Sequence, residues 1–199
     1  MPTVSISAAT IYCQQRGYDL LPVASWHYIL CHMAARESAA QAAERIAPDI
    51  AELWNRVSSG RHEGHYYVAL FGLRRYDALH VMEQIRRGFA YSAFERFQRN
   101  TELPYRVLAE AAEIPERTLA RRKESGRLGP DESDRLARLA RVVARAIELF
   151  EGDVEGARGW LTSPVTALGG QTPLEFASVD AGAIEVEHLI GRLEHGIPT

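Results

Sequence analysis

The chain has 199 residues, 46% of them hydrophobic and 25% charged, which is typical of a globular protein of one or two domains. It lacks an apolar run of about 18 residues, a basic and apolar leader, and more than two cysteines. We therefore expect no membrane span, no secretory signal, no disulfide framework and a cytoplasmic location. The net charge of −3 divides unevenly: residues 84–145 hold 14 basic and 9 acidic residues, net +5, and residues 146–199 hold 2 and 9, net −7. A polyanion would be attracted to this basic middle and repelled by the acidic end, although solvated helix faces explain the same charges.

The first 75 residues are the least regular part of the chain. Residues 1–35 show no clean periodicity and stay unassigned, and one hypothesis is that Met33 is the true start. Residues 36–75 are expected to form a helical dimerisation region, with a helix over 39–57 that is interrupted near Pro48. Residues 65–73 fit either a strand or a helix. We predict no metal or cofactor, because the cysteines and histidines of the N-terminal segment fit no common zinc spacing: Cys13, His27, Cys31 and His32.

Two helix signals follow in residues 76–103. Apolar residues at every third position predict a helix whose inner face carries Leu79, Met82 and Ile85, and which ends at a left-handed Gly88. Ser92 and Glu95 have the spacing of a capping box and predict the start of the next helix.

A short helix from Pro104 and a second helix from Pro115 to about residue 125 have helix-turn-helix spacing, with Leu119 facing the core. In such a unit the first turns of the second helix face the base edges of the major groove. Glu113 occupies a turn position that usually needs glycine and a positive φ. The alternative is a plain helical hairpin with an exposed basic face. The predicted DNA-binding residues are Glu116, Arg117, Thr118, Arg121, Arg122, Lys123 and Arg127, and we expect phosphate contacts from Arg135, Arg138, Arg141 and Arg145.

Pro130 and two acidic residues begin a long helix. Its apolar stripe is Leu136, Leu139, Val143, Ile147 and Phe150. A short helix over 153–161 and a loop over 163–171 come next. Thr172-Pro173-Leu174-Glu175 forms a capping box, and the last helix covers 181–194.

These segments carry the residues of a recognisable family. The runs over 114–123 and 126–128 and the C-terminal motifs over 157–196, including Ala167-Leu168-Gly169-Gly170 and Leu189-Ile190-Gly191-Arg192-Leu193, resemble Xre/MbcA/ParS-type antitoxins, which accompany RES-domain toxins. The resemblance covers residues 76–199 well. It implies an all-α fold, with an Xre-like helix-turn-helix domain over 76–150 and a toxin-binding domain over 151–199. It also implies a homodimer that represses its own operon at operator DNA and blocks a toxin acting on NAD⁺.

The C-terminal residues offer contacts to such a toxin. An aromatic anchor, a Gly pair and acidic groups suit a partner built around an anionic dinucleotide. Core positions explain Trp160 and Leu193 equally well, and the glycines can simply turn the chain. Two alternatives to an antitoxin are a transcriptional regulator without a toxin partner and a purely structural protein. No catalytic constellation is present, so we do not expect an enzyme. The predicted toxin-binding residues are Trp160, Leu168, Gly169, Gly170, Thr172, Glu187, Leu193, Glu194, His195 and Gly196, with Glu185 as a further acidic group.

Overall fold

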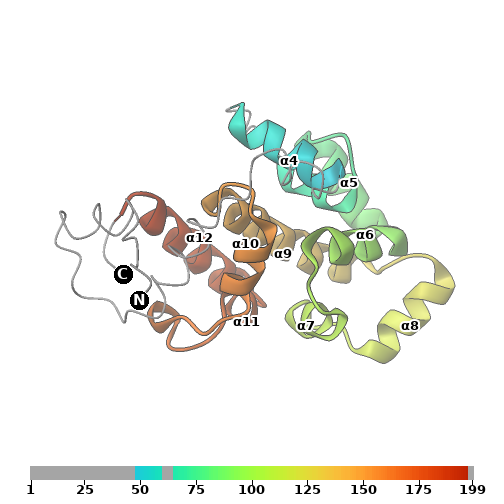
Figure 1. The fold of residues 1–199 in the computed structure, drawn as a ribbon. Helices are drawn as coiled ribbons and strands as arrows, with labels where there is room; N and C mark the ends of the chain where they lie inside the picture. Colours follow the sequence, from blue (N-terminus) through green and yellow to red (C-terminus); the bar gives the residue numbers. More distant parts are fainter. Residues whose placement is uncertain (1–47, 60–64, 197–199) are drawn as a thin grey trace, which may run out of the picture. The chain divides into compact units, whose positions relative to one another are not determined.

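A computed structural model of the chain describes residues 48–59 and 65–196, all of them in one compact unit over Ile46–Ile197. Within these ranges every regular element is a helix, and extended backbone pairs only at an isolated bridge between Ala90 and Arg127 (Figure 1). The expected all-α fold is confirmed. Residues 1–47, including Met33 and both cysteines, lie outside the described residues. None of the described helices is long and apolar enough to cross a membrane.

The N-terminal part of the described chain consists of α4 (Pro48–Ser58) and a 3-10 helix, η1 (Tyr66–Phe71). The choice left open for residues 65–73 is thus settled as a short helix, with all six residues of η1 buried. The buried Asp49 of α4 accepts hydrogen bonds from Arg74 at 3.1 Å, Arg96 at 2.6 Å and Asn100 at 2.9 Å. This cluster ties α4 to the helices that follow it.

Helix α5 (Ala78–Arg87) presents a different face to the core from the one predicted. Leu79 is 86% exposed and Met82 is 45% exposed, whereas Val81 is fully buried. The prediction was wrong because three apolar residues are too short a stripe to set the phase of a helix. Gly88 has a positive φ of 79° but a ψ of 137°, so it is not left-handed helical. A Cβ at Gly88 would lie 2.0 Å from the carbonyl oxygen of Leu128, and this close approach requires glycine.

Helix α6 (Tyr91–Thr101) begins one residue before Ser92, the first residue of the predicted capping box. Its first N–H group, that of Tyr91, is satisfied by the carbonyl of Gly126 at 2.9 Å, in the loop that forms the isolated bridge. Ser92 therefore lies inside the first turn and caps nothing, and Glu95 pairs with Lys123 instead. Tertiary pairing has replaced the local capping signal.

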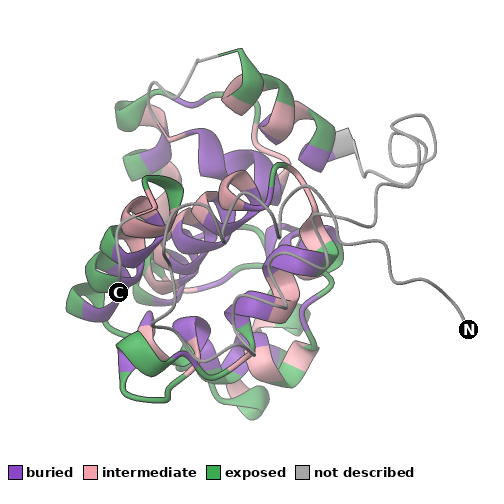
Figure 2. Ribbon diagram, turned by 60° about the vertical axis from the view of Figure 1, so that its left-hand side comes forward, coloured by how far each residue is buried: buried purple, intermediate pink, exposed green. Residues whose placement is uncertain are grey.

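Helix α9 (Pro130–Leu149) is the central element. The five residues of its predicted apolar stripe are all buried, as predicted. It packs against η1, α5, α10 and α12, and buried residues gather where the helices face one another (Figure 2). At about 1.5 Å per residue, the 20 residues of α9 make it about 30 Å long.

The C-terminal helices are α10 (Val154–Leu161), η2 (Thr166–Leu168), α11 (Pro173–Phe176) and α12 (Asp180–Glu194). The predicted capping box of α11 is confirmed: Thr172 accepts from the N–H of Glu175 at 3.1 Å and Glu175 accepts from the N–H of Thr172 at 3.0 Å. The N–H of Thr172 holds the pKa of Glu175 below its usual value. On α12 the inner face buries Val186, Leu189 and Ile190.

Candidate functional site

Helices α7 (Tyr105–Ala111) and α8 (Glu116–Ser125) form the predicted helix-turn-helix unit. The turn places Glu113 at a φ of +51°, the left-handed conformation that the sequence predicted. Leu108 and Leu119 are fully buried and join the two helices to the core. Helix α8 packs chiefly on α7 and otherwise lies at the edge of the fold (Figure 1). One side of α8 is therefore open to a partner.

The open side of α8 carries two arginines. Arg117 and Arg121 are exposed, and neither has an ion pair within the described residues. Because four residues complete about one turn, Arg117 and Arg121 lie on the same face, opposite the buried Leu119. Thr118 is half-buried beside them and Glu116 opens the helix. Two unpaired guanidinium groups one turn apart can reach bases or phosphates without breaking any internal contact.

Arg122 has a structural partner. Its guanidinium donates two-pronged hydrogen bonds to the Glu132 carboxylate, each about 2.9–3.0 Å long, across the turn between α8 and α9. Burial alone would raise the pKa of Glu132, but hydrogen bonds from Arg122 and the Gly129 N–H outweigh burial and lower it. This pair fixes the angle between α8 and α9.

Two further predicted DNA-binding cations also have partners inside the chain. Lys123 lies 3.5 Å from Glu95 of α6, and the Arg127 guanidinium donates to the carbonyl of Gly88 at 2.5 Å. Both remain exposed at the surface. They can contact phosphates only by sharing or exchanging these partners.

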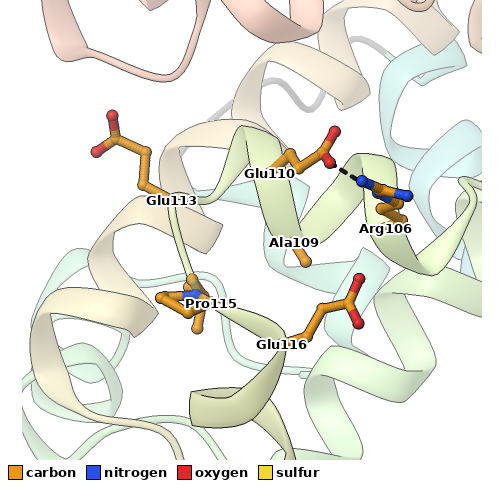
Figure 3. Close-up of a pocket in the computed structure, with 7 residues that line it drawn as sticks. Arg106, Ala109, Glu110, Glu113, Pro115 and Glu116 are labelled. Carbon is orange, nitrogen blue, oxygen red and sulfur yellow. Dashed lines mark hydrogen bonds and ion pairs between the residues drawn. The ribbon is translucent and has the colours of Figure 1, made fainter.

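A hollow lies beside the helix-turn-helix turn, and three carboxylates surround it: those of Glu110, Glu113 and Glu116 (Figure 3). Arg106 donates to Glu110 at 2.9 Å and neutralises one of them, and Arg135 lies 4.0 Å from Glu113. Acidic groups near the N-terminus of α8 stabilise that helix but repel phosphate. Any DNA backbone must approach α8 away from this hollow, on the side of its two free arginines.

The arginines in the second half of α9 do not face solvent as expected. Arg141 donates to Glu187 of α12, and Arg145 donates to Glu148 and, at 2.9 Å, to Glu194 of α12. These arginines can reach phosphates, and these glutamates a toxin's basic groups, only by sharing or exchanging their partners. Both roles stay predictions. Arg135 and Arg138 are half-buried, each with a buried Nε that lacks a hydrogen-bond partner.

The predicted toxin-binding residues divide into buried and exposed ones. Trp160 and Leu168 are 4% and 5% exposed, and Trp160 packs on Phe150, so both are core residues. Leu193 and Gly196 are half-buried. Gly169 and Gly170 are exposed with φ of +68° and +84°, and His195 is exposed at the end of α12. The sequence prediction overlooked the outer side of α12, where Ile184 is 41% exposed.

A helix-turn-helix unit with free arginines, joined by one long helix to a second group of helices, defines a class of two-part DNA-binding protein, and comparisons with known proteins agree. Residues 80–141 match the antitoxin Xre-like helix-turn-helix domain, and residues 145–196 match the antitoxin Xre/MbcA/ParS C-terminal toxin-binding domain. The antitoxin Xre of Yersinia enterocolitica serotype O:8 is 37% identical over 59% of this chain and 80% of its own length. The antitoxin Xre of Photorhabdus laumondii is 34% identical over the same shares.

A more distant relative from a Sphingobium species, named a Prs ADP-ribosylating antitoxin, is 24% identical over 65% of this chain and 86% of its own length. The present chain belongs to the Xre antitoxin family. It therefore combines an antitoxin helix-turn-helix domain with a toxin-binding domain. Among residues 48–59 and 65–196, no group of three or more histidines, cysteines or acidic residues is arranged to hold a metal ion.

Proposed function

We propose that this antitoxin neutralises a RES-domain toxin that consumes NAD⁺ and that, as a homodimer, it represses its own operon at operator DNA. The observation that carries the proposal is the presence of two antitoxin domains, one after the other, on one chain. Each matched range includes part of α9. The toxin class comes from the resemblance of the C-terminal motifs to antitoxins that accompany RES-domain toxins. Bacterial operators and NAD⁺ pools are cytoplasmic, so the proposal places the protein there.

The proposed DNA contacts centre on the free face of α8. Arg117 and Arg121 enter the major groove and bond guanine edges or phosphates, while Glu116 and Thr118 flank them. The Arg122–Glu132 pair holds α8 at its angle, and Lys123 and Arg127 add weaker phosphate contacts. A homodimer fits because helix-turn-helix proteins read two half-sites about 34–36 Å apart.

The proposed toxin contacts use the exposed parts of the C-terminal domain. These are the Gly169–Gly170 loop and the end of α12 at His195 and Gly196. Trp160, Leu168 and Thr172 support these parts from within the domain, because they pack in the core or cap α11.

The test is expression of the full chain together with the protein encoded beside its gene, with growth and cellular NAD⁺ as readouts. We expect the neighbouring protein alone to deplete NAD⁺ and stop growth, and the full chain to restore both. Purified chain should bind the promoter DNA of its own operon with an affinity that falls steeply with salt, because phosphate contacts release counterions. Unchanged NAD⁺ in cells that express the neighbouring protein alone would refute the RES assignment.

A further inference from the structure

The outer side of α12 carries an unusual row of residues, which we call the α12 stripe: Ile184, His188, Gly191 and His195. Their spacing of four, three and four residues places them along one side of the helix. That side is opposite Val186, Leu189 and Ile190, which are buried. Ile184 is 41% exposed, and Val179, directly before α12, is 54% exposed. Two of the four large apolar residues that are exposed in the described chain thus lie at this one helix.

No contact among the described residues explains Gly191. Glycine weakens a helix because it gains the most freedom on unfolding, so its presence needs a reason. Gly182 of the same helix has one: a Cβ there would lie 1.8 Å from the carbonyl oxygen of Phe176. Among residues 48–59 and 65–196, a Cβ at Gly191 would meet nothing within 4 Å. As far as these residues go, the space beside Gly191 is open, which is what close approach by another molecule requires.

The rotation of α12 about its own axis is set by its buried apolar face together with two charge pairs. Glu187 and Glu194 pair with Arg141 and Arg145 of α9 on one flank of the helix. Since these pairs anchor that flank, the stripe faces away from α9 and stays available. The helix is thus held in one orientation before any partner binds, which lowers the entropic cost of binding.

We propose that the α12 stripe is the contact that captures the toxin: a segment of toxin backbone lies against Gly191, and Ile184 enters an apolar pocket beside it. This inference rests on the proposed function and names the surface that performs its toxin-binding half. The stripe lies within the residues that match the toxin-binding domain. The occupant is the toxin rather than a second copy, because the family model that covers α12 describes a toxin-binding domain. Asp180 and Glu185 beside the stripe are 71% and 57% exposed, although Asp180 lies 4.0 Å from Arg141 and Glu185 lies 3.7 Å from His188. A toxin that binds the anionic dinucleotide NAD⁺ offers basic groups to both.

The test measures the affinity of purified full-length variants for the purified toxin encoded beside the gene, together with thermal unfolding. Gly191→Gln should weaken toxin binding at least tenfold, yet raise the unfolding midpoint by roughly 2–4 °C, because the helix gains propensity and no described residue is displaced. Ile184→Arg should weaken binding by a similar factor. Leu79→Arg is the matched control, because it makes the same kind of change at an exposed apolar residue of α5, outside the toxin-binding domain.

A higher unfolding midpoint together with a weaker affinity for the toxin in Gly191→Gln would support the α12 stripe. If Gly191 had a purely structural role, its substitution would change stability and toxin affinity in the same direction. Toxin affinities of Gly191→Gln and Ile184→Arg within about twofold of wild type would overturn it, as would equal loss in Leu79→Arg. A changed oligomeric state with intact toxin binding would assign the stripe to a second copy and also overturn it. If the wild-type chain itself does not bind the toxin, both the proposed function and this inference are refuted. If the wild-type chain binds the toxin, the variants test the α12 stripe alone.

Discussion

Helices α8 and α12 lie far apart, with α9 between them (Figure 1), and they use their charged residues in opposite ways. On α8 two arginines face solvent without internal partners. On α12 the carboxylates of Glu187 and Glu194 are bound to arginines of α9, and the free side is partly apolar. The charge of −7 in residues 146–199 therefore overstates the acidity of the surface that α12 presents. Net charge along a sequence predicts a partner only after internal pairs are subtracted.

Helix α9 serves both regions. Its first turn carries Glu132, which holds Arg122 of α8, and its second half carries Arg141 and Arg145, which hold α12. A single rigid helix thus sets the orientation of both surfaces. The comparison between α8 and α12 can be tested by substitution. Some variants remove the free charges of α8, and others remove the paired charges that hold α8 or α12 to α9.

The largest effect should come from the free charges. Replacing Arg117 and Arg121 together by alanine should weaken operator binding on the order of 10²–10⁴-fold, since each well-placed contact contributes roughly 1–3 kcal/mol. Stability and toxin binding should stay unchanged, because neither side chain has a partner within the described residues. Fluorescence anisotropy with operator DNA measures operator affinity, and calorimetry with the toxin measures toxin affinity.

Arg99→Ala is the matched control, since Arg99 is also exposed and without an ion pair in the described chain but lies on α6. Its operator affinity should change less than tenfold. An equal loss for Arg99→Ala would mean that general basic charge, and not the α8 face, binds the DNA.

The fold was predictable wherever a periodic signal was long. The stripe of α9 repeats over 20 residues, so its phase is unambiguous, and the capping box at Thr172 depends only on neighbours in sequence. The three-residue stripe at Leu79 was too short to set a phase, and the capping signal at Ser92 was overridden by backbone pairing with Gly126. Local signals fail where a tertiary contact satisfies the same backbone groups.

The sequence showed which residue types form the candidate site, but it did not show which of them have ion-pair partners inside the protein. The positions of basic residues indicated a nucleic-acid surface, yet Arg122 meets Glu132 across a turn and Arg141 meets Glu187 at a separation of 46 residues. No sequence pattern separates such pairs from free charges. Gly191 could have been noticed from the sequence, because a glycine inside an amphipathic helix is an exception that asks for a cause.

The next largest effect should follow from breaking the Arg122–Glu132 pair. Arg122→Ala should lower the free energy of unfolding by about 1.5–3 kcal/mol, because it leaves the buried Glu132 carboxylate with only the Gly129 N–H. Operator affinity should fall as α8 loses its fixed angle. Denaturant unfolding measures the stability loss.

The loss should depend on pH. The pKa of Glu132 lies below its ordinary value of 4.5 in the folded chain, so its contribution is present above pH 4.5 and disappears as the pH falls through the folded pKa. The gap between wild type and Arg122→Ala should therefore narrow below about pH 4.5. A gap that is constant from pH 7 to the acid limit would show that the ion pair is not its origin.

A smaller effect is expected where arginines hold α12. Arg141→Met should reduce stability by roughly 0.5–1 kcal/mol, since its pair with Glu187 is partly exposed. Toxin affinity should fall a few-fold because α12 loses one of the two charge pairs that help to orient it, and operator affinity should stay at the wild-type value. Arg192→Met is the control, since Arg192 lies on α12 without an ion pair within the described range. If Arg141→Met lost more affinity for the operator than for the toxin, Arg141 would serve DNA binding and not the orientation of α12.

The smallest effect should come from the strained turn beside α8, and it should have the opposite sign. Glu113→Gly removes a side chain from a residue in the left-handed conformation, which relieves about 1 kcal/mol of backbone strain. Glycine also gives the unfolded chain more freedom, which offsets most of this relief. The free energy of unfolding should therefore rise by up to about 0.5 kcal/mol. It also removes one carboxylate from the hollow beside α8 (Figure 3), so operator affinity should rise severalfold. Glu151→Gly, at a φ of +53° in the loop after α9, is the matched control and should change stability alone. Equal rises in operator affinity for both variants would mean that net charge, and not the position of Glu113 at the α7–α8 turn, limits how DNA approaches.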